Sequence, residues 1–128
     1  GPTLAIASGQ LRALREKTYA WGLSTSAAGA SGDADRPVYA PWDCTVASIR
    51  IWATANPTGT ATGNVKAGAT GLASTAPSLA PAALGPVSAS GGWTAGTIPA
   101  GTPLLGTFGT VPADSRGLTI ELTIREAP

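Results

Sequence analysis

The feature of this sequence that most constrains its fold is a strict alternation of apolar and polar side chains over residues 117–125. The apolar positions are Leu118, Ile120, Leu122 and Ile124, and the polar ones are Thr119, Glu121, Thr123 and Arg125. Successive side chains of a β-strand point to opposite faces of a sheet, so a period of two predicts a strand with one buried face. The chain therefore needs a second layer to cover that face.

Further strand candidates are separated by segments rich in Gly, Pro, Ser and Ala. They are residues 17–23, 38–42, 45–53, 63–69, 93–98 and 103–108. Residues 24–36 and 70–92 are predicted as long loops, and turns are expected at 56–59 and 99–102, where Pro presets φ and Gly accepts a positive φ. Short strands joined by such turns predict an all-β chain, an antiparallel β-sandwich or jelly roll with long Gly/Pro/Ala-rich loops.

The strand expected at residues 45–53 is apolar on both faces. Ala47, Ile49 and Ile51 are expected on one face, and Val46, Ser48, Arg50 and Trp52 on the other. A two-sided strand fits the middle of a sandwich or a contact between subunits. Ile49, Ile51 and Trp52 are therefore candidates for a subunit interface.

Residues 1–17 are expected to form an N-terminal arm ahead of a sandwich domain at residues 18–128. Gly1-Pro2 resembles the scar left by a tag-cleaving protease, so we expect a processed start. Leu11 and Leu14 lie at helical spacing, with Ser8 as a candidate N-cap, which favours a short helix. An extended arm fits the segment equally.

The composition removes most catalytic chemistry. The chain has no His and one Cys, which excludes Ser-His-Asp, Cys-His and zinc sites. The acidic residues Asp33, Asp35 and Asp43 lack the spacing of a calcium loop, and no glycine run has the spacing of a phosphate-binding loop. We expect no metal, no cofactor and no enzymatic activity. A glycosidase would need two carboxylates from a set without convergence: Asp43, Asp114, Glu121 and Glu126.

Charge and hydropathy exclude two classes of partner. The formal net charge is +1, and the eight basic residues are mostly scattered singly, whereas nucleic-acid binding needs clustered cations. No apolar run is long enough to cross a bilayer, so membrane insertion is not expected.

The four tryptophans and the one cysteine receive separate predictions. Cys44 lies within an apolar alternation and is predicted to be a small buried hydrophobe. Trp21, Trp52 and Trp93 lie in or beside strands and are expected in the core or at an interface. Trp42 follows Pro41 at a strand break, so it is expected to be the most exposed of the four and is a candidate glycan contact.

Four segments carry a resemblance to a known class of protein. Residues 38–50 read VYAPWDCTVASIR and are followed by Pro57-Thr58-Gly59; residues 98–104 read IPAGTPL and residues 117–125 read GLTIELTIR. Together they resemble virion proteins of tailed phages and gene transfer agents, namely the β-sandwich or jelly-roll domains of head decoration, head spike and tail fibre proteins. The Asn-Gly hairpin frequent in such proteins is replaced by residues 65–71, which leaves the order of the middle strands open.

The resemblance implies a non-catalytic structural protein on the surface of a virion, bound to capsid or tail proteins, with host surface glycans as a further expected contact. It implies a homo-oligomer, with a trimer favoured, and it does not distinguish head from tail. Leu11 and Leu14 would then anchor the chain to the particle or to the next subunit, the alternative being an ordinary first element packed on its own domain. A carbohydrate-binding module that uses Trp42 is the alternative function.

Overall fold

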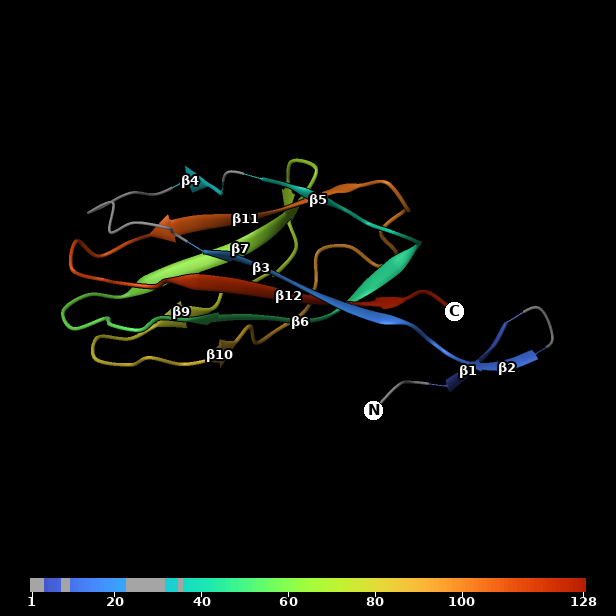
Figure 1. Ribbon diagram of the computed structural model, residues 1–128, viewed down its shortest axis with the longest axis horizontal. Coiled ribbons are helices and arrows are strands. Elements are labelled where there is room, and N and C mark those ends of the chain that lie inside the picture. The colour runs from blue at the N-terminus through green and yellow to red at the C-terminus, as the bar shows by residue number, and fades with distance from the viewer. Residues whose placement is uncertain (1–3, 8–9, 23–31, 35) are drawn as a thin grey trace.

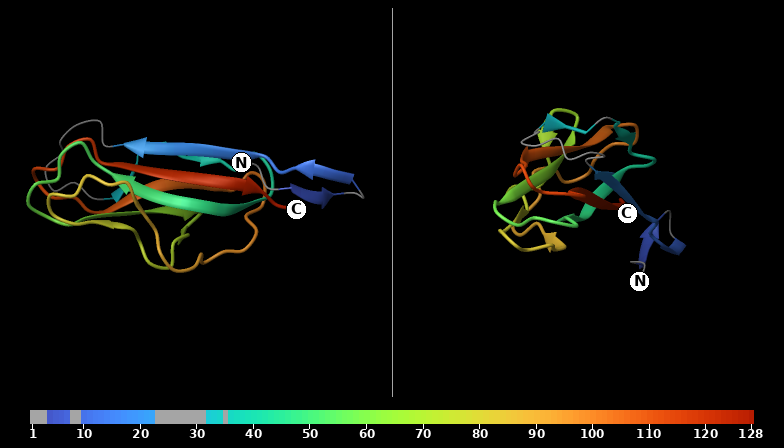
Figure 2. Two further views of the ribbon diagram at one scale, coloured as in Figure 1. Left: turned by 90° about the horizontal axis from the view of Figure 1, so that it is seen from below. Right: turned by 60° about the vertical axis from the view of Figure 1, so that its left-hand side comes forward.

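The structure is a computed structural model that describes residues 4–7, 10–22, 32–34 and 36–128, with side chains described from residue 13 onward. All regular elements within these ranges are β-strands, and they form two antiparallel sheets and a separate two-stranded hairpin (Figure 1). The two sheets face each other as the layers of a sandwich (Figure 2). The all-β sandwich is therefore confirmed, whereas the jelly-roll alternative stays a prediction.

The first sheet contains the longest described strand, β6 (Cys44–Trp52). Its order is β10 (Val87–Ser88), β6 (Cys44–Trp52), β12 (Thr119–Glu126) and β3 (Glu16–Gly22). The alternation at residues 117–125 places four apolar side chains in the core, each at most 1% exposed: Leu118, Ile120, Leu122 and Ile124. Because β12 lies between β6 and β3, its inner side chains form the centre of one layer of the core.

The second sheet is built around two long strands and several short ones. Its order is β4 (Gly32–Asp33), β11 (Pro103–Thr110), β7 (Ala61–Ala67) and β8 (Thr70–Gly71), while β5 (Val38–Tyr39) also pairs with β11 and β9 (Ser78–Leu79) with β7. Two inner-face glycines give room to large residues of the facing sheet. A Cβ atom on Gly63 would lie 2.6 Å from Cδ1 of Ile120, and one on Gly106 would lie 2.8 Å from Cβ of Trp21.

A β-bulge changes the side-chain phase of β6. Ser48 pairs with Thr123 and Val46 with Ile124, so Ala47 is the extra residue between them. Val46 therefore faces the core with Ile49 and Ile51, while Ala47 is only half-buried. The predicted faces of Val46 and Ala47 were wrong, because strict alternation does not hold across a bulge.

Two other local predictions differ from the structure. Residues 93–98 form no strand; Trp93 and Ile98 take part only in isolated bridges, to Ala73 and Cys44. The N-terminal segment is not helical, since β1 (Leu4–Ala7) and β2 (Gln10–Ala13) pair antiparallel from Leu4–Ala13 to Ala7–Gln10. The apolar spacing that suggested a helix fits a hairpin whose strands are each four residues long.

The β1–β2 hairpin lies beyond one end of the sandwich, next to the C-terminus, in both Figure 1 and Figure 2. It forms a sheet of its own and pairs with no other described strand. A second end of the molecule, where β6 finishes at Trp52, lies away from it (Figure 1).

Candidate functional site

Two motif segments of the resemblance, residues 38–50 and 98–104, meet at the end of the sandwich that carries the hairpin. Cys44 and Ile98 exchange both backbone hydrogen bonds, at 2.9 and 2.7 Å. The Asp43 carboxylate accepts a hydrogen bond from the amide of Ala100 at 2.8 Å. The motif residues thus fasten the 98–102 turn to the start of β6, so they specify how the end of the sandwich closes.

The Pro57-Thr58-Gly59 turn has the same kind of role at the opposite end. Thr58 donates to the carboxylate of Asp114 at 2.8 Å. The buried amide of Asn56 donates to the carbonyls of Gly59, Leu79 and Ala80 and accepts a hydrogen bond from Ser115 at 2.6 Å. These motif residues are accounted for by packing and turn formation.

The acidic residues also serve structural interactions. Besides the contacts of Asp43 and Asp114, Glu126 pairs with Arg15 and Glu121 with Arg50. The Asp33 carboxylate pairs with Lys66, which lowers its pKa through a hydrogen bond, with a smaller contribution from Thr107. Among the described residues no group of three metal-binding side chains occurs, and Asp35 lies outside them.

The N-terminal hairpin is fastened to the sandwich at its base. Leu14 is 4% exposed, and the carbonyl of Arg15 accepts a hydrogen bond from the amide of Glu126 at 2.8 Å. The Arg15 guanidinium pairs with the Glu126 carboxylate at 2.7 Å, and this hydrogen bond raises the pKa of Arg15. Arg15 also lies over the Trp42 ring, 5.1 Å from its centroid. A firmly held base thus carries a hairpin that pairs with nothing else described.

Of the residues predicted for a subunit interface whose side chains are described, only Trp52 is half-buried rather than buried. Ile49 and Ile51 are 0% exposed in the core of the chain itself, which agrees with the alternative that this strand lies in the middle of a sandwich and leaves neither side chain for a second subunit to contact. The second sheet covers the face of β6 on which Ile49 and Ile51 lie and so buries both side chains. Leu14 is buried at the base of the hairpin, and the side chain of Leu11 lies outside the described part.

Cys44 is fully buried, as predicted. Burial raises the pKa of its thiol, and the neighbouring Asp43 adds to the effect. Burial likewise raises the pKa of Tyr19, which lies under the ammonium group of Lys17. A protonated, enclosed thiol is a poor nucleophile, so Cys44 fits a packing role.

The four tryptophans differ in what covers them. Trp21 belongs to the core and donates to the carbonyl of Arg36 at 2.8 Å, while Trp42 and Trp93 are half-buried against the core. Trp52 is also half-buried but is neither in the core nor packed against it. Trp42 was expected to be the most exposed tryptophan, but it packs against the core. Trp52 is the tryptophan that does not.

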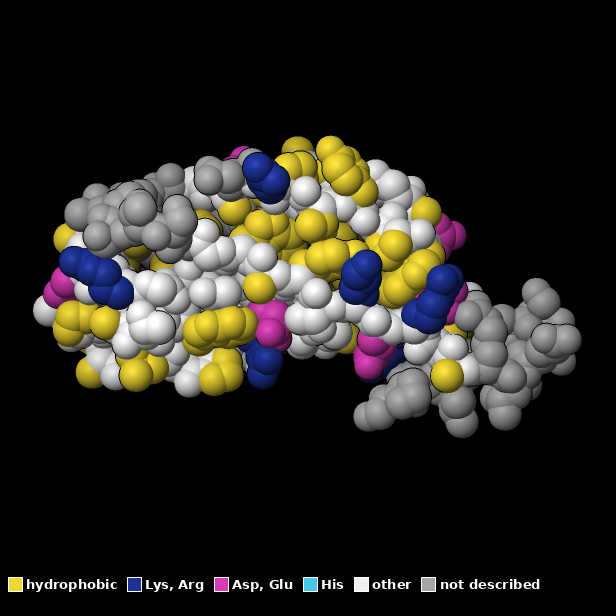
Figure 3. Space-filling view, in the orientation of Figure 1, with side chains coloured by type: hydrophobic (Ala, Val, Ile, Leu, Met, Phe, Trp, Pro, Cys, Tyr) yellow, Lys and Arg dark blue, Asp and Glu magenta, His cyan; other side chains and the backbone are white. Residues whose placement is uncertain are grey.

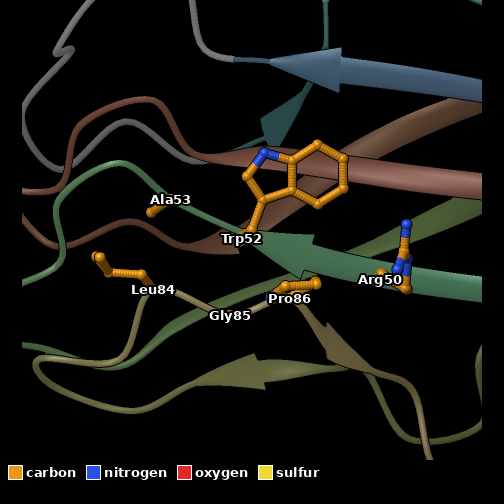
Figure 4. A pocket seen from close by; sticks show the side chains of 6 residues that line it. All are labelled: Arg50, Trp52, Ala53, Leu84, Gly85 and Pro86. Atoms are coloured by element: carbon orange, nitrogen blue, oxygen red, sulfur yellow. The ribbon is translucent and has the colours of Figure 1, made fainter.

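Trp52 lines a hollow on the outer face of the first sheet. The hollow has a volume of about 360 Å³ and is bounded by Arg50, Trp52, Ala53, Leu84, Gly85 and Pro86. Figure 4 shows the indole standing at one side, Arg50 at another, and residues 84–86 along the floor of the view. Sequence reasoning missed Leu84 and the contribution of Arg50, because both depend on how residues 84–86 return to β6.

Arg50 is held in place beside the hollow by Glu121. The two residues are opposite each other in the β6–β12 register, and the Arg50 Nε donates to a Glu121 carboxylate oxygen at 2.8 Å. The Arg50 guanidinium carbon lies 6.0 Å from the centroid of the Trp52 ring. The hollow thus combines an aromatic ring with a fixed pair of hydrogen-bonding groups.

No known protein family, curated protein or solved structure matches the chain. The described residues contain no helix suited to crossing a bilayer.

Proposed function

We propose that this chain is a non-catalytic structural protein of a phage-like particle, a decoration, spike or fibre domain attached through its N-terminal hairpin. The observation that carries the proposal is the hairpin itself. Among the described strands β1 and β2 pair only with each other, while the base at Leu14 and Arg15 is fixed to the sandwich. A two-stranded hairpin is at best marginally stable alone in water, so a hairpin of this length fits a segment that pairs with a partner.

The partner class in this proposal is a capsid or tail protein of the particle. A hairpin offers unpaired backbone groups on both outer edges, and such edges add readily to a strand of another protein. The arrangement would hold the sandwich at the virion surface by one end and present the other end outward. The expected homo-oligomer, with a trimer favoured, belongs to the same proposal.

The surface of the sandwich supports a binding role. The described carboxylates are engaged in ion pairs, in turns, or in closing the ends of the fold, and the tightly packed core depends on close contacts such as Gly106 on Trp21. A stable sandwich of this kind acts by the surface it presents.

The first test is immunogold electron microscopy on particles shed by the source organism. Label on heads or tails is expected and would also distinguish the two locations. The second test compares the full chain with a variant that lacks residues 1–13, by co-sedimentation with particles from which the protein has been removed. The variant is expected to keep the circular-dichroism spectrum of the sandwich and to lose at least about tenfold in particle binding.

The matched control is Thr58→Ala, a change at the end of the sandwich remote from the hairpin, which should bind particles like the unaltered chain. Unlabelled particles, or equal binding by the truncated variant, would contradict the proposal.

A further inference from the structure

We propose that the hollow beside Trp52 binds a neutral sugar ring of a glycan, stacked on the indole and hydrogen-bonded by Arg50 and Glu121. This goes beyond attachment to a particle, and it assigns a ligand site to Trp52, which the sequence indicated as a candidate subunit contact.

Trp52 is the tryptophan whose position is explained least by packing against the core. Trp21, Trp42 and Trp93 lie in the core or against it, whereas Trp52 stands on the outer face of β6. Across the sheet it faces Thr119, and the next position in that row is Gly22, which has no side chain to cover the ring. An indole left beside small residues presents an apolar plane with a polar N–H at its edge, which suits a ligand that is apolar on one face and polar around its rim.

A sugar ring is such a ligand, since its C–H groups form an apolar face and its hydroxyls surround it. The ion pair next to the indole matches those hydroxyls. Arg50 offers only donors and Glu121 only acceptors, and a hydroxyl can bond to either. The side chains are 39% and 16% exposed, so solvent and a ligand can reach the pair although Glu121 is largely enclosed.

The pairing also fixes the geometry before a ligand arrives. Glu121 holds the Arg50 guanidinium through Nε, and the Trp52 ring lies 6.0 Å from the guanidinium carbon. Fixed side chains lose less conformational entropy when a ligand binds, which favours affinity. Leu84, a residue that is 49% exposed, lies at another edge of the hollow, and its side chain points away from the indole in Figure 4.

The electrostatics of the hollow favour a neutral glycan over an anionic polymer. Arg50 is matched by Glu121, so the site carries no excess positive charge. In Figure 3, acidic and basic side chains lie close together on this side of the molecule, and no broad basic surface is visible. The volume of about 360 Å³ lies at the small end of ligand sites, which suits one or two sugar units.

The location agrees with use on a particle surface. β6 begins at Cys44, beside the base of the hairpin, and ends at Trp52, so the hollow and the hairpin lie toward opposite ends of the sheet (Figure 1). A chain attached by its hairpin would keep the hollow available. Ligand binding by the isolated chain and attachment to a particle are also separate measurements, so one proposal can fail without the other.

The test is saturation-transfer NMR on the full chain with four neutral probes: linear tetrasaccharides of glucose, galactose, mannose and N-acetylglucosamine. This readout does not depend on tryptophan as the reporter. At least one tetrasaccharide is expected to give a saturable signal, and Trp52→Ala is expected to weaken its affinity at least about tenfold. The matched control is Trp42→Phe, at a half-buried tryptophan that also lies beside an arginine, and it should leave the affinity unchanged.

A second pair of variants tests the hydrogen-bonding part of the site. Glu121→Gln should weaken binding by roughly threefold to tenfold, because the charge-assisted contacts of Glu121 are reduced. Glu16→Gln alters the analogous pair with Arg125 on the same sheet and should have no effect. No signal with any tetrasaccharide, unchanged affinity in Trp52→Ala, or loss of affinity in Trp42→Phe would overturn the proposal. A saturable signal from a proline-rich peptide alone would also overturn it, since the hollow would then be a peptide site.

Discussion

The first sheet and the long connection at residues 70–102 both bury apolar side chains, but by different means. In the sheet, β12 pairs along its whole length with β3 on one side and β6 on the other. The connection has only the short strands β8, β9 and β10, yet Leu72 and Leu79 are 0% exposed. Burial in this molecule therefore does not require a continuous backbone ladder.

Asparagine side chains replace the ladder in the connection. Asn64 accepts a hydrogen bond from the amide of Ala73 at 3.0 Å and donates to the carbonyl of the same residue at 3.1 Å. Asn56 reaches the carbonyls of Leu79 and Ala80. An amide side chain has the same donor and acceptor as a peptide group, so it can satisfy a buried backbone where no strand lies alongside.

The largest expected effect comes from removing core volume in each region. Leu122→Ala in the sheet and Leu79→Ala in the connection should each lower the free energy of unfolding by about 2–5 kcal/mol, because each deletes a fully buried side chain. Denaturant-induced unfolding, followed by both fluorescence and circular dichroism, measures the two losses. A loss below about 1 kcal/mol for Leu79→Ala alone would mean that the connection is not part of the cooperative core.

The next effect concerns the amide that replaces backbone pairing. Asn56→Ala should destabilise the fold by about 2–3 kcal/mol, because it leaves buried carbonyls and the Ser115 hydroxyl without a partner. Thr58→Ala, in the same turn but exposed, should cost less than about 1 kcal/mol. Equal losses in the two variants would show that turn formation, not the buried amide, is what matters at this end.

A smaller and more local effect is expected at Asn64. Asn64→Ala removes two hydrogen bonds to Ala73 from a part-buried site and should cost about 1–2 kcal/mol. Hydrogen exchange should quicken at the amides of Ala73 and Thr94, which lie on the segment that Asn64 holds, more than at those of β12. Uniform quickening over the whole chain would instead mean that the connection opens only when the sandwich unfolds.

The same contrast explains which parts of the fold were predictable. The alternation at residues 117–125 requires no tertiary information, and β12 is confirmed there. The bulge at Ala47 depends on the register with Thr123 and Ile124, which no local pattern reports. Residues 93–98 resemble a strand in composition, but only Trp93 and Ile98 find bridging partners.

The candidate site was less predictable than the fold. Glu121 was placed on the polar face of its strand and Arg50 on the same face as Trp52, but 71 residues separate them, and only the pairing of β6 with β12 brings them together. Leu84 lines the same hollow as Trp52 from a segment without regular structure. By contrast, a reader of the sequence would choose Trp42 from its place at a strand break, where Arg15 and the core in fact cover it.

The smallest expected effect lies at β4, a two-residue strand that, like those of the connection, is held by a side chain. The Asp33 carboxylate reaches past β11 to Lys66 of β7, at 2.8 Å from Oδ1 to Nζ, and this lowers its pKa below the ordinary value of 3.8. A lowered pKa in the fold stabilises the protein above the pKa of the unfolded chain, and the contribution disappears as pH falls through the folded value. The melting temperature of Asp33→Asn should therefore lie slightly below that of the unaltered chain at pH 6, and the gap should close as the solution is acidified below about pH 4. In Lys66→Gln, the pKa of Asp33, measured by NMR titration, should return toward 3.8, because the hydrogen bond from the Lys66 ammonium group is the largest cause of its lowering. A gap that persists in strong acid would assign the effect of Asp33 to the shape of β4 rather than to its charge, and β4 would then be held by its pairing with β11 instead of by a side chain.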